Sequence, residues 1–263
     1  MEIQLPSNIS YLSTDTNQAQ FTITPCYPGY GTTLGNSMRR VLLSSLPGAA
    51  ITSVKIKGID HEFSTADYLK EDVVDILLNL KQVKFNMHTD EAVELKLSVT
   101  GKKKITVGDF EKNNEVEVAN PKLVICTLTD AAASMDMTVI VEKGRGYVPI
   151  EAREKEVLDV GFMAIDAVYT PIRTVNFKTE HVRVEQMTNY DKLTLDITTD
   201  GTMSPEEAFV QASQILVDHF TLLGNATTAE ETIKEEIEED VEEDQATEEV
   251  EEEKDDEATD TEK

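Results

Sequence analysis

Residues 29–45 read GYGTTLGNSMRRVLLSS and contain the strongest helical pattern in the first part of the chain. The apolar residues that follow this pattern are Leu34, Met38, Val41, Leu42 and Leu46. Their spacing predicts a helix with one apolar side, and the pair Pro47-Gly48 ends it. Arg39 and Arg40 lie off the centre of the apolar stripe. The helix therefore needs a surface to cover that stripe.

A second helix is predicted after residue 203. Ser204 supplies a capping hydroxyl, Pro205 occupies the first helical position, and Glu207 stands at the third. The apolar stripe of this helix consists of Phe209, Ala212, Ile215, Leu216, Phe220 and Leu223. The pair Gly224-Asn225 ends it. This stripe also needs a partner surface.

Strands dominate the sequence between these two helices. Alternating apolar residues predict strands at residues 20–27, 51–56, 92–141, 164–176, 182–186 and 192–198. A further amphipathic helix is predicted at residues 67–80. The polar turns between the strands favour mostly antiparallel pairing. The pattern indicates the α+β class.

Charge is distributed unevenly along the 263 residues, whose formal net charge is −27. Residues 229–263 hold 20 acidic residues against three lysines, net −17, which leaves −10 for residues 1–228. Self-repulsion and scarce apolar area predict a disordered acidic tail. The acidic body excludes non-specific binding of duplex DNA through a broad basic face.

The chemistry-bearing residues do not form a recognisable active site. Cys26 and Cys126 each lie in an alternating apolar run, where a thiol is typically a small buried hydrophobe. The four histidines lack metal-ligand spacing, so we expect no metal and no cofactor. No secretory signal and no apolar run of membrane-spanning length are present, so we expect a cytoplasmic protein without a membrane contact.

Several segments, in this order, resemble the amino-terminal part of the bacterial RNA polymerase α subunit. The first is residues 29–45, followed directly by LPGAAITSVKIKGIDHEFST at residues 46–65. The others are EDVVDILLNLK (71–81), GRGYVP (144–149), DAVYTPI (166–172) and VRVEQMTNYDKLTLDITTDGTMSPEEA (182–208). A shared strand-rich composition does not produce so many ordered matches.

The resemblance implies two subdomains. Residues 1–50 and 172–228 would form a discontinuous dimerisation subdomain, with two amphipathic helices on an antiparallel sheet. Residues 51–171 would form an inserted, sheet-rich subdomain, and residues 229–263 the acidic tail. The two unpartnered helical stripes support a two-fold interface independently, because each copy can cover the other.

The resemblance also implies a role in assembly. In the family, a homodimer docks the β subunit on one protomer and the β′ subunit on the other, and ω and σ join the holoenzyme. The chain would then be a subunit of DNA-directed RNA polymerase, a nucleotidyltransferase (EC 2.7.7.6), while carrying no catalytic residue itself.

Individual roles follow only where motifs match. The resemblance implies docking of β or β′ by Arg40, Leu43, Lys81 and Ile165. It implies a dimer interface at Leu34, Met38, Leu42, Ile215, Leu216 and Phe220. For the interface residues other than Met38, a place in the protomer core is an equal alternative.

One departure from the family concerns DNA. The family continues into a carboxy-terminal domain that binds promoter DNA and activators, whereas this sequence ends in the acidic tail, so we expect no direct promoter contact. Three other interpretations stay open. They are an archaeal or eukaryotic α counterpart that works as a heterodimer, an acidic-tailed chaperone for basic proteins, and a hydrolase with an unrecognised site.

Overall fold

The computed structural model describes residues 3–153 and 161–225 of the chain. The contacts divide the chain into two compact units, Met1–Ser213 and Gln214–Lys263. The acidic segment predicted to be disordered, residues 229–263, lies outside the described residues.

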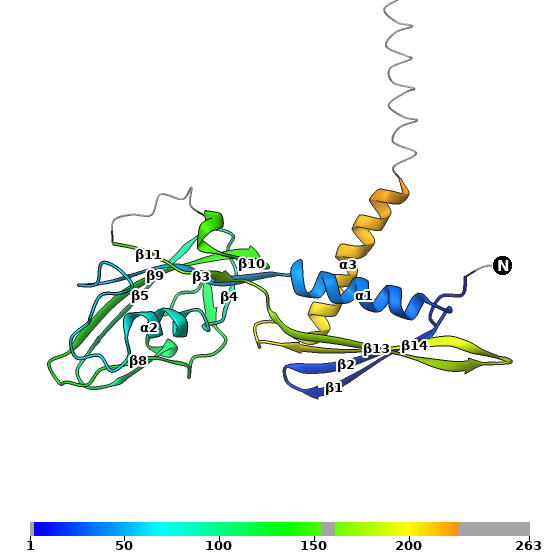
Figure 1. The fold of residues 1–263 in the computed structure, drawn as a ribbon, viewed down its shortest axis with the longest axis horizontal. Coiled ribbons are helices and arrows are strands. Elements are labelled where there is room, and N and C mark those ends of the chain that lie inside the picture. Colours follow the sequence, from blue (N-terminus) through cyan, green and yellow to red (C-terminus); the bar gives the residue numbers. More distant parts are fainter. Residues whose placement is uncertain (1–2, 154–160, 226–263) are drawn as a thin grey trace, which may run out of the picture. The chain divides into compact units, whose positions relative to one another are not determined.

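The first sheet has four antiparallel strands that come from opposite ends of the first unit (Figure 1). In sheet order they are β1 (Asn8–Asp15), β2 (Gln18–Cys26), β14 (Met187–Thr199) and β13 (Ile172–Val184). Helix α1 (Tyr30–Ser44) lies against β13 and β14. The strand predicted at residues 20–27 is confirmed as β2, whose Phe21 and Ile23 are buried.

The start of α1 is held by a buried carboxylate from the sheet. Asp191 Oδ2 accepts the backbone N–H groups of Gly29 (2.9 Å) and Gly31 (3.3 Å), which lack partners at a helix start. The close approach leaves no room for a side chain at Gly31 or Gly35. A Cβ on Gly35 would lie 2.6 Å from the Phe177 ring. Glycine therefore allows α1 to lie directly on the sheet.

Helix α3 (Pro205–Gly224) begins with the predicted capping box, which is confirmed. Ser204 N donates to Glu207 Oε2 (3.1 Å), and Glu207 N donates to Ser204 Oγ (3.2 Å). In the part of α3 that belongs to the first unit, Ala208 is buried and Phe209 stacks on Phe21, with ring centroids 4.3 Å apart. The first turns of α3 are therefore anchored to β2.

Ser204→Ala is expected to lower the free energy of unfolding by about 1 kcal/mol, because the Glu207 amide loses its acceptor. Chemical denaturation measures the change. The control is Gln211→Ala, an exposed position within the same helix, which is expected to change stability by less than about 0.5 kcal/mol. Equal effects of the two substitutions would show that the cap is unimportant.

The second sheet has six strands. Its main path runs β5 (Val93–Thr100), β9 (Ser134–Arg145), β3 (Pro47–Ile56), β4 (Phe85–Met87) and β7 (Val116–Val118). Strand β11 (Met163–Ala164) also pairs with β3. Helix α2 (Val73–Leu80) contributes its buried side, Val73, Ile76 and Leu80, to the large apolar core of this sheet.

Shorter elements complete the region around this sheet. The strand pairs are β6 (Lys104–Thr106) with β8 (Val124–Thr127) and β10 (Tyr147–Val148) with β12 (Ala167–Val168). Two 3₁₀ turns are η1 (Val107–Asp109) and η2 (Ile150–Arg153). All of the strand pairs described are antiparallel, and with the three helices they confirm the predicted α+β class.

Two sequence predictions need correction. The helix predicted at residues 67–80 begins only at Val73, because tertiary contacts hold the preceding residues in a non-helical path that includes Tyr68 at φ +63°. Leu69 bridges to Leu128, and the Glu71 carboxylate accepts the Thr127 amide (2.7 Å). The strands predicted at residues 164–176 and 182–186 have the wrong boundaries. Residues from Ile172 to Val184 form one continuous strand, β13, which pairs with β14.

The buried state predicted for both cysteines is confirmed. Cys26 and Cys126 are inaccessible, and both are free thiols. Burial, together with the nearby Glu71 carboxylate, raises the pKa of Cys126 to about 12. Among the residues that the structure describes, no helix combines the length and the apolar content needed to cross a membrane.

Candidate functional site

The two sheets meet where the chain leaves α1 and where it returns to β13. At this junction Pro47 pairs with Arg145 at the end of the β3–β9 ladder. The backbone of Tyr169 passes so close that a Cβ on Gly48 would lie 1.8 Å from its carbonyl oxygen. A Cβ on Gly144 would lie 2.7 Å from the Tyr169 ring. Two glycines thus permit the tight crossing that joins the sheets.

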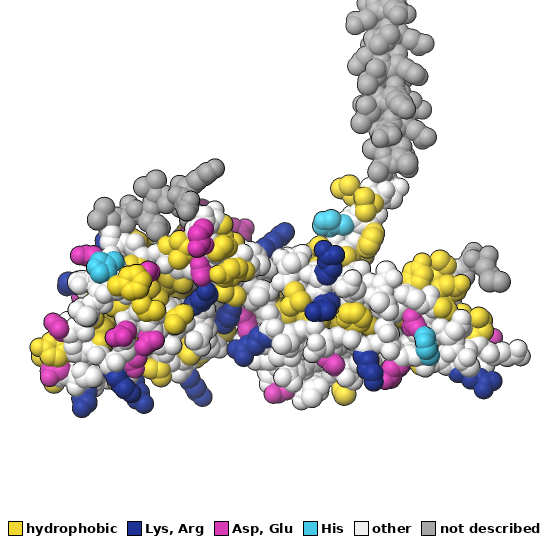
Figure 2. Space-filling view, in the orientation of Figure 1, with side chains coloured by type: hydrophobic (Ala, Val, Ile, Leu, Met, Phe, Trp, Pro, Cys, Tyr) yellow, Lys and Arg dark blue, Asp and Glu magenta, His cyan; other side chains and the backbone are white. Residues whose placement is uncertain are grey.

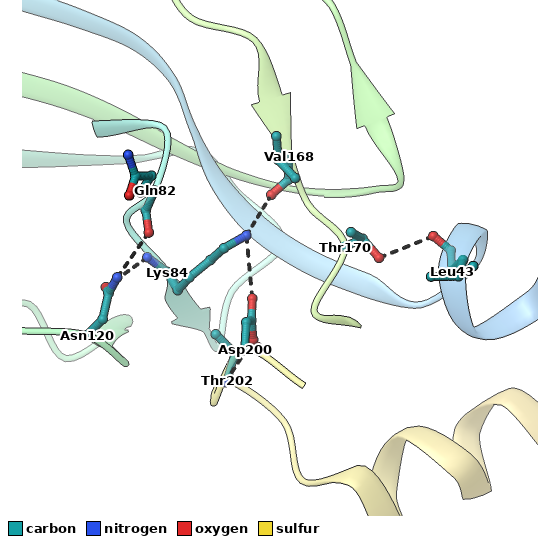
Figure 3. A network of polar contacts seen from close by, with 8 residues as sticks. All are labelled: Leu43, Gln82, Lys84, Asn120, Val168, Thr170, Asp200 and Thr202. Carbon is teal, nitrogen blue, oxygen red and sulfur yellow. Dashed lines mark hydrogen bonds and ion pairs between the residues drawn. The ribbon is translucent and has the colours of Figure 1, made fainter. Parts of the chain in front are cut away.

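The end of α1 contacts the returning chain at the same place. Thr170 Oγ1 donates to the Leu43 carbonyl oxygen (3.2 Å; Figure 3). Gly146 has φ +67°, and a Cβ there would lie 3.6 Å from the Ser44 carbonyl oxygen. The Gly146 carbonyl accepts the Tyr169 amide (2.9 Å). The GRGYVP and DAVYTPI segments therefore meet beside the end of α1.

Lys81, at the end of α2, reaches the same region through Asp166. Its ammonium Nζ lies 2.8 Å from Asp166 Oδ2 and 5.4 Å from the centroid of the Tyr147 ring. The hydrogen bond from Lys81 is the largest influence on the pKa of Asp166, which lies below its usual value. The hydrogen bond to Asp166 raises the pKa of Tyr147. Lys81 and Tyr147, which are distant in sequence, thus both donate to the carboxylate of Asp166.

Arg40 and Leu43 are exposed on α1, while Lys81 is half-buried. These residues, together with Tyr147 and Asp166, are called the junction strip below. Leu43 and Lys81, two of the four predicted docking residues, each contact the returning segment 166–170: Thr170 Oγ1 donates to the Leu43 carbonyl, and Lys81 donates to Asp166. Arg40 lies one turn before Leu43 on α1.

Ile165 is different, because its side chain is only 4% exposed and belongs to the core of the second sheet. Its amide donates to the Thr52 carbonyl (2.9 Å), and its own carbonyl accepts the Arg153 guanidinium. The residue at the surface is its neighbour Asp166. The side chain of Ile165 offers a partner almost no area in this protomer.

The predicted interface residues on α1 are mostly covered within the protomer. Leu42 has no exposed surface and Met38 is buried, while Leu34 is half-buried against the Ile23 and Leu193 cluster. For Leu42, full burial favours the core alternative, because a side chain without exposed area cannot add contact area to an interface.

The predicted interface residues on α3 lie in the second unit, where they differ in exposure. Ile215 and Leu216 are half-buried, whereas 62% of the surface of Phe220 is exposed. Val217, Leu222 and Leu223 are exposed as well. This part of α3 presents far more apolar surface than the buried stripe of α1.

A buried polar network at the junction was missed by sequence reasoning. Lys84 Nζ lies 3.5 Å from Asp200 Oδ2 and 3.4 Å from the Val168 carbonyl oxygen that accepts from it (Figure 3). The two side chains are only 14% and 3% exposed. Asp200 Oδ1 also accepts the Thr202 hydroxyl (2.6 Å). Lys84 thereby links the second sheet to the end of β14.

Only weak signals for this network exist in the sequence. Asp200 precedes a glycine and so indicates a turn, and Lys84 stands between the apolar residues Val83 and Phe85, where alternation indicates an ordinary surface lysine. Asn120 supports Lys84, since its side chain accepts the Lys84 amide (3.0 Å) and donates to the Gln82 carbonyl (3.0 Å). A pairing over more than 100 residues has no local pattern that could reveal it.

On the face shown in Figure 2, Lys and Arg side chains alternate with Asp and Glu and do not merge into one broad basic area. In residues 3–153 and 161–225 no group of three or more His, Cys, Asp or Glu side chains gathers in a way that could hold a metal ion.

Comparisons with known proteins find one matching family model and several relatives. The family model described as RNA polymerase Rpb3/RpoA insert domain matches residues 54–170. A protein of Symbiobacterium thermophilum named DNA-directed RNA polymerase subunit alpha is 46% identical over 223 residues, which is 85% of this chain and 70% of the relative.

Two further relatives carry the same name. The Phocaeicola vulgatus protein is 44% identical over 235 residues, covering 88% of this chain and 71% of its own length. The Bacteroides fragilis protein is 44% identical over 228 residues, covering 86% and 69%. At this identity and coverage, the chain belongs to the family of bacterial RNA polymerase α subunits.

Proposed function

We propose that this protein is a homodimeric scaffold that nucleates assembly of the β and β′ subunits for DNA-directed transcription. The observation that carries the proposal is the 44–46% identity to α subunits over 85–88% of the chain. The protein would hold the larger subunits of a nucleotidyltransferase in position, and those subunits would carry the catalytic residues. ω and σ would join the same cytoplasmic complex.

Two subdomains would divide this work. Residues 1–50 and 172–228 would dimerise, and residues 51–171 would form the inserted subdomain. The sheet order supports the division, because β2 pairs with β14 and so places β1 and β2 in one sheet with β13 and β14, while the intervening strands form separate sheets. The family-model match at residues 54–170 supports it as well.

The dimer contact would be made by α1 and α3 of two copies. The exposed apolar side chains of the second unit, Val217, Phe220, Leu222 and Leu223, support a partner for α3. Removing apolar surface from water is favourable by about 25 cal/mol for each Å² buried, so pairing of these side chains would stabilise a dimer. Ile215 and Leu216 would contribute at the edge of the contact.

The docking contact would lie on the junction strip. Arg40 is exposed on α1, and its planar guanidinium can bind a carboxylate of the partner in a bidentate manner. Leu43 adds apolar area one turn later, and Lys81 adds a second cation. The chemistry of the strip fits a partner surface with acidic groups around an apolar centre.

Arg40→Ala is expected to weaken capture of β by at least about tenfold while leaving the dimer intact, because it removes a charged contact at a rim of apolar area. Native mass spectrometry of the chain purified with co-expressed β and β′ measures both results. The matched control is Arg39→Ala, the exposed neighbour on the same helix, which is expected to keep full recovery.

Other outcomes distinguish the alternatives. A wild-type monomer that recovers neither large subunit would overturn the scaffold. An obligate one-to-one complex with a different small subunit would favour the heterodimeric counterpart. If removal of residues 229–263 abolishes partner binding while Arg40→Ala does nothing, the protein is an acidic-tailed chaperone.

A further inference from the structure

The chain crosses between the two sheets twice, and both crossings lie at the same place. It leaves α1 for β3 through residues 45–46 and returns from β12 to β13 through residues 169–171. The crossings run side by side, since Thr170 Oγ1 donates to the Leu43 carbonyl oxygen (3.2 Å) and the Tyr169 carbonyl lies against Gly48. Two adjacent crossings form a hinge, because they permit one sheet to rotate against the other.

Side-chain packing between the sheets is sparse. Among the described residues, no element of the first sheet or of the helices on it packs along an element of the second sheet. A cavity of about 180 Å³ is lined by residues 47–49 and 85–87 of the second sheet and by Thr202 and Met203, which follow β14. Close-packed interiors leave few voids larger than a water molecule. Packing therefore does little to stop rotation at the hinge.

A buried ion pair joins the sheets beside this cavity. Lys84, which directly precedes β4, places its Nζ 3.5 Å from Asp200 Oδ2 at the end of β14. The same ammonium donates to the Val168 carbonyl oxygen (3.4 Å; Figure 3). The Lys84 and Asp200 side chains are 14% and 3% exposed, so salt screens their attraction much less than that of a surface pair. The pair is a third connection between the sheets, and it is not covalent.

Both ends of this connection are fixed in place. The Lys84 amide donates to Asn120 Oδ1 (3.0 Å), and the Lys84 carbonyl accepts the Ala119 amide (2.9 Å). Asp200 Oδ1 accepts the amide (3.1 Å) and the hydroxyl (2.6 Å) of Thr202. Because neither end can follow the other, rotation at the hinge would separate the pair. Separation would leave two buried charges unpaired, which is costly.

We propose that the Lys84–Asp200 pair is a conformational latch, which holds the two sheets in one arrangement across the hinge. With the latch closed, the sheets move as one body, and surfaces on both are presented at a fixed spacing. The latch belongs to the chain alone and is measured without any partner. Its failure would therefore leave the proposed scaffold function standing.

The alternative is an ion pair that serves stability alone. Replacing both charges together separates the two roles, because removal of one partner is costly whereas exchange of a whole buried pair is often neutral for stability. Lys84→Met keeps the aliphatic stem, and Asp200→Asn keeps an oxygen that can accept from Thr202. The double substitution is expected to open the latch while each sheet stays folded.

The test measures the distance between two spin labels in the full-length chain. The labels are attached through Ser10→Cys on β1 and Thr100→Cys on β5, since both positions are exposed while Cys26 and Cys126 are buried. An excess of unlabelled chain keeps one labelled copy in each particle. We expect one narrow distance distribution with Lys84 and Asp200 in place, and at least about a twofold broadening with both replaced.

The matched control makes the same two substitutions in an ion pair that does not join the sheets. Lys143→Met with Asp90→Asn removes a contact of 2.6 Å, and Lys143 lines the same cavity. The distance distribution of this control is expected to stay narrow. Equal broadening in the control would overturn the latch, because any lost pair near the cavity would then have the same effect. An unchanged distribution in the Lys84→Met, Asp200→Asn variant would overturn it as well.

Circular dichroism and thermal unfolding establish that each variant is folded. If the double variant does not fold, Asp200→Asn alone is measured with the same labels. A folded Asp200→Asn chain with a broadened distribution supports the latch. A narrow distribution in that chain overturns it, and so does a failure of Asp200→Asn to fold, since the carboxylate would then be needed for folding itself.

Discussion

Asp200→Ala is expected to lower the free energy of unfolding by about 3 kcal/mol or more. The Asp200 side chain is 3% exposed, and its removal leaves the Lys84 ammonium buried with only the Val168 carbonyl as a partner. It also removes the acceptor of the Thr202 amide and hydroxyl. Urea denaturation followed by circular dichroism measures the loss.

The control for this prediction is an exposed ion pair. Lys57→Met breaks the pair with Asp136, in which the side chains are 80% and 42% exposed, and is expected to cost less than about 1 kcal/mol. If Asp200→Ala costs no more than Lys57→Met, the Lys84–Asp200 contact does not stabilise the junction, despite its burial.

Gly48→Ala is expected to have the largest effect, a loss of about 4 kcal/mol or more that prevents folding of the first unit. A Cβ at this position would lie 1.8 Å from the Tyr169 carbonyl oxygen, which is backbone and cannot move as a flexible side chain can. Strand β3 or the segment around Tyr169 would have to shift. The pairing of β3 with β9 would then break at its end, where Pro47 faces Arg145. Soluble expression and thermal unfolding measure the result.

A matched control is Gly224→Ala at the end of α3. Nothing lies within 4 Å of a Cβ at Gly224, so alanine is expected to leave stability unchanged or slightly raised. Stability of Gly48→Ala within about 1 kcal/mol of the unsubstituted protein would show that the crossing at the junction adjusts easily.

Local elements followed from the sequence wherever a short-range pattern decided them. The alternation around Phe21 indicated β2, and Ser204 with Glu207 indicated the start of α3, because capping and amphipathic spacing depend on residues a few positions apart. The prediction of a helix from residue 67 was wrong for its first six residues. Contacts of Leu69 and Glu71 with the segment around Thr127 override helical propensity there.

The candidate site was only partly predictable. Arg40, Leu43 and Lys81 could be named from motifs that resemble the α subunit, and their role in docking stays a prediction. Asp166 was visible as the first residue of DAVYTPI, yet nothing local indicates that it accepts Lys81, 85 positions earlier. The sequence also did not indicate which side chains are exposed, since Ile165 is buried whereas its neighbour Asp166 is partly exposed.

By itself, the sequence determined the α+β class, most strands, both long helices and the family, because periodicity, capping and ordered motifs are properties of the linear chain. Only the tertiary structure decided that Lys84 pairs with Asp200, that Asp166 joins three segments, and that Gly48 lies against Tyr169. These contacts join residues far apart in sequence, and their energies depend on burial and distance, which exist only once the two sheets have packed together.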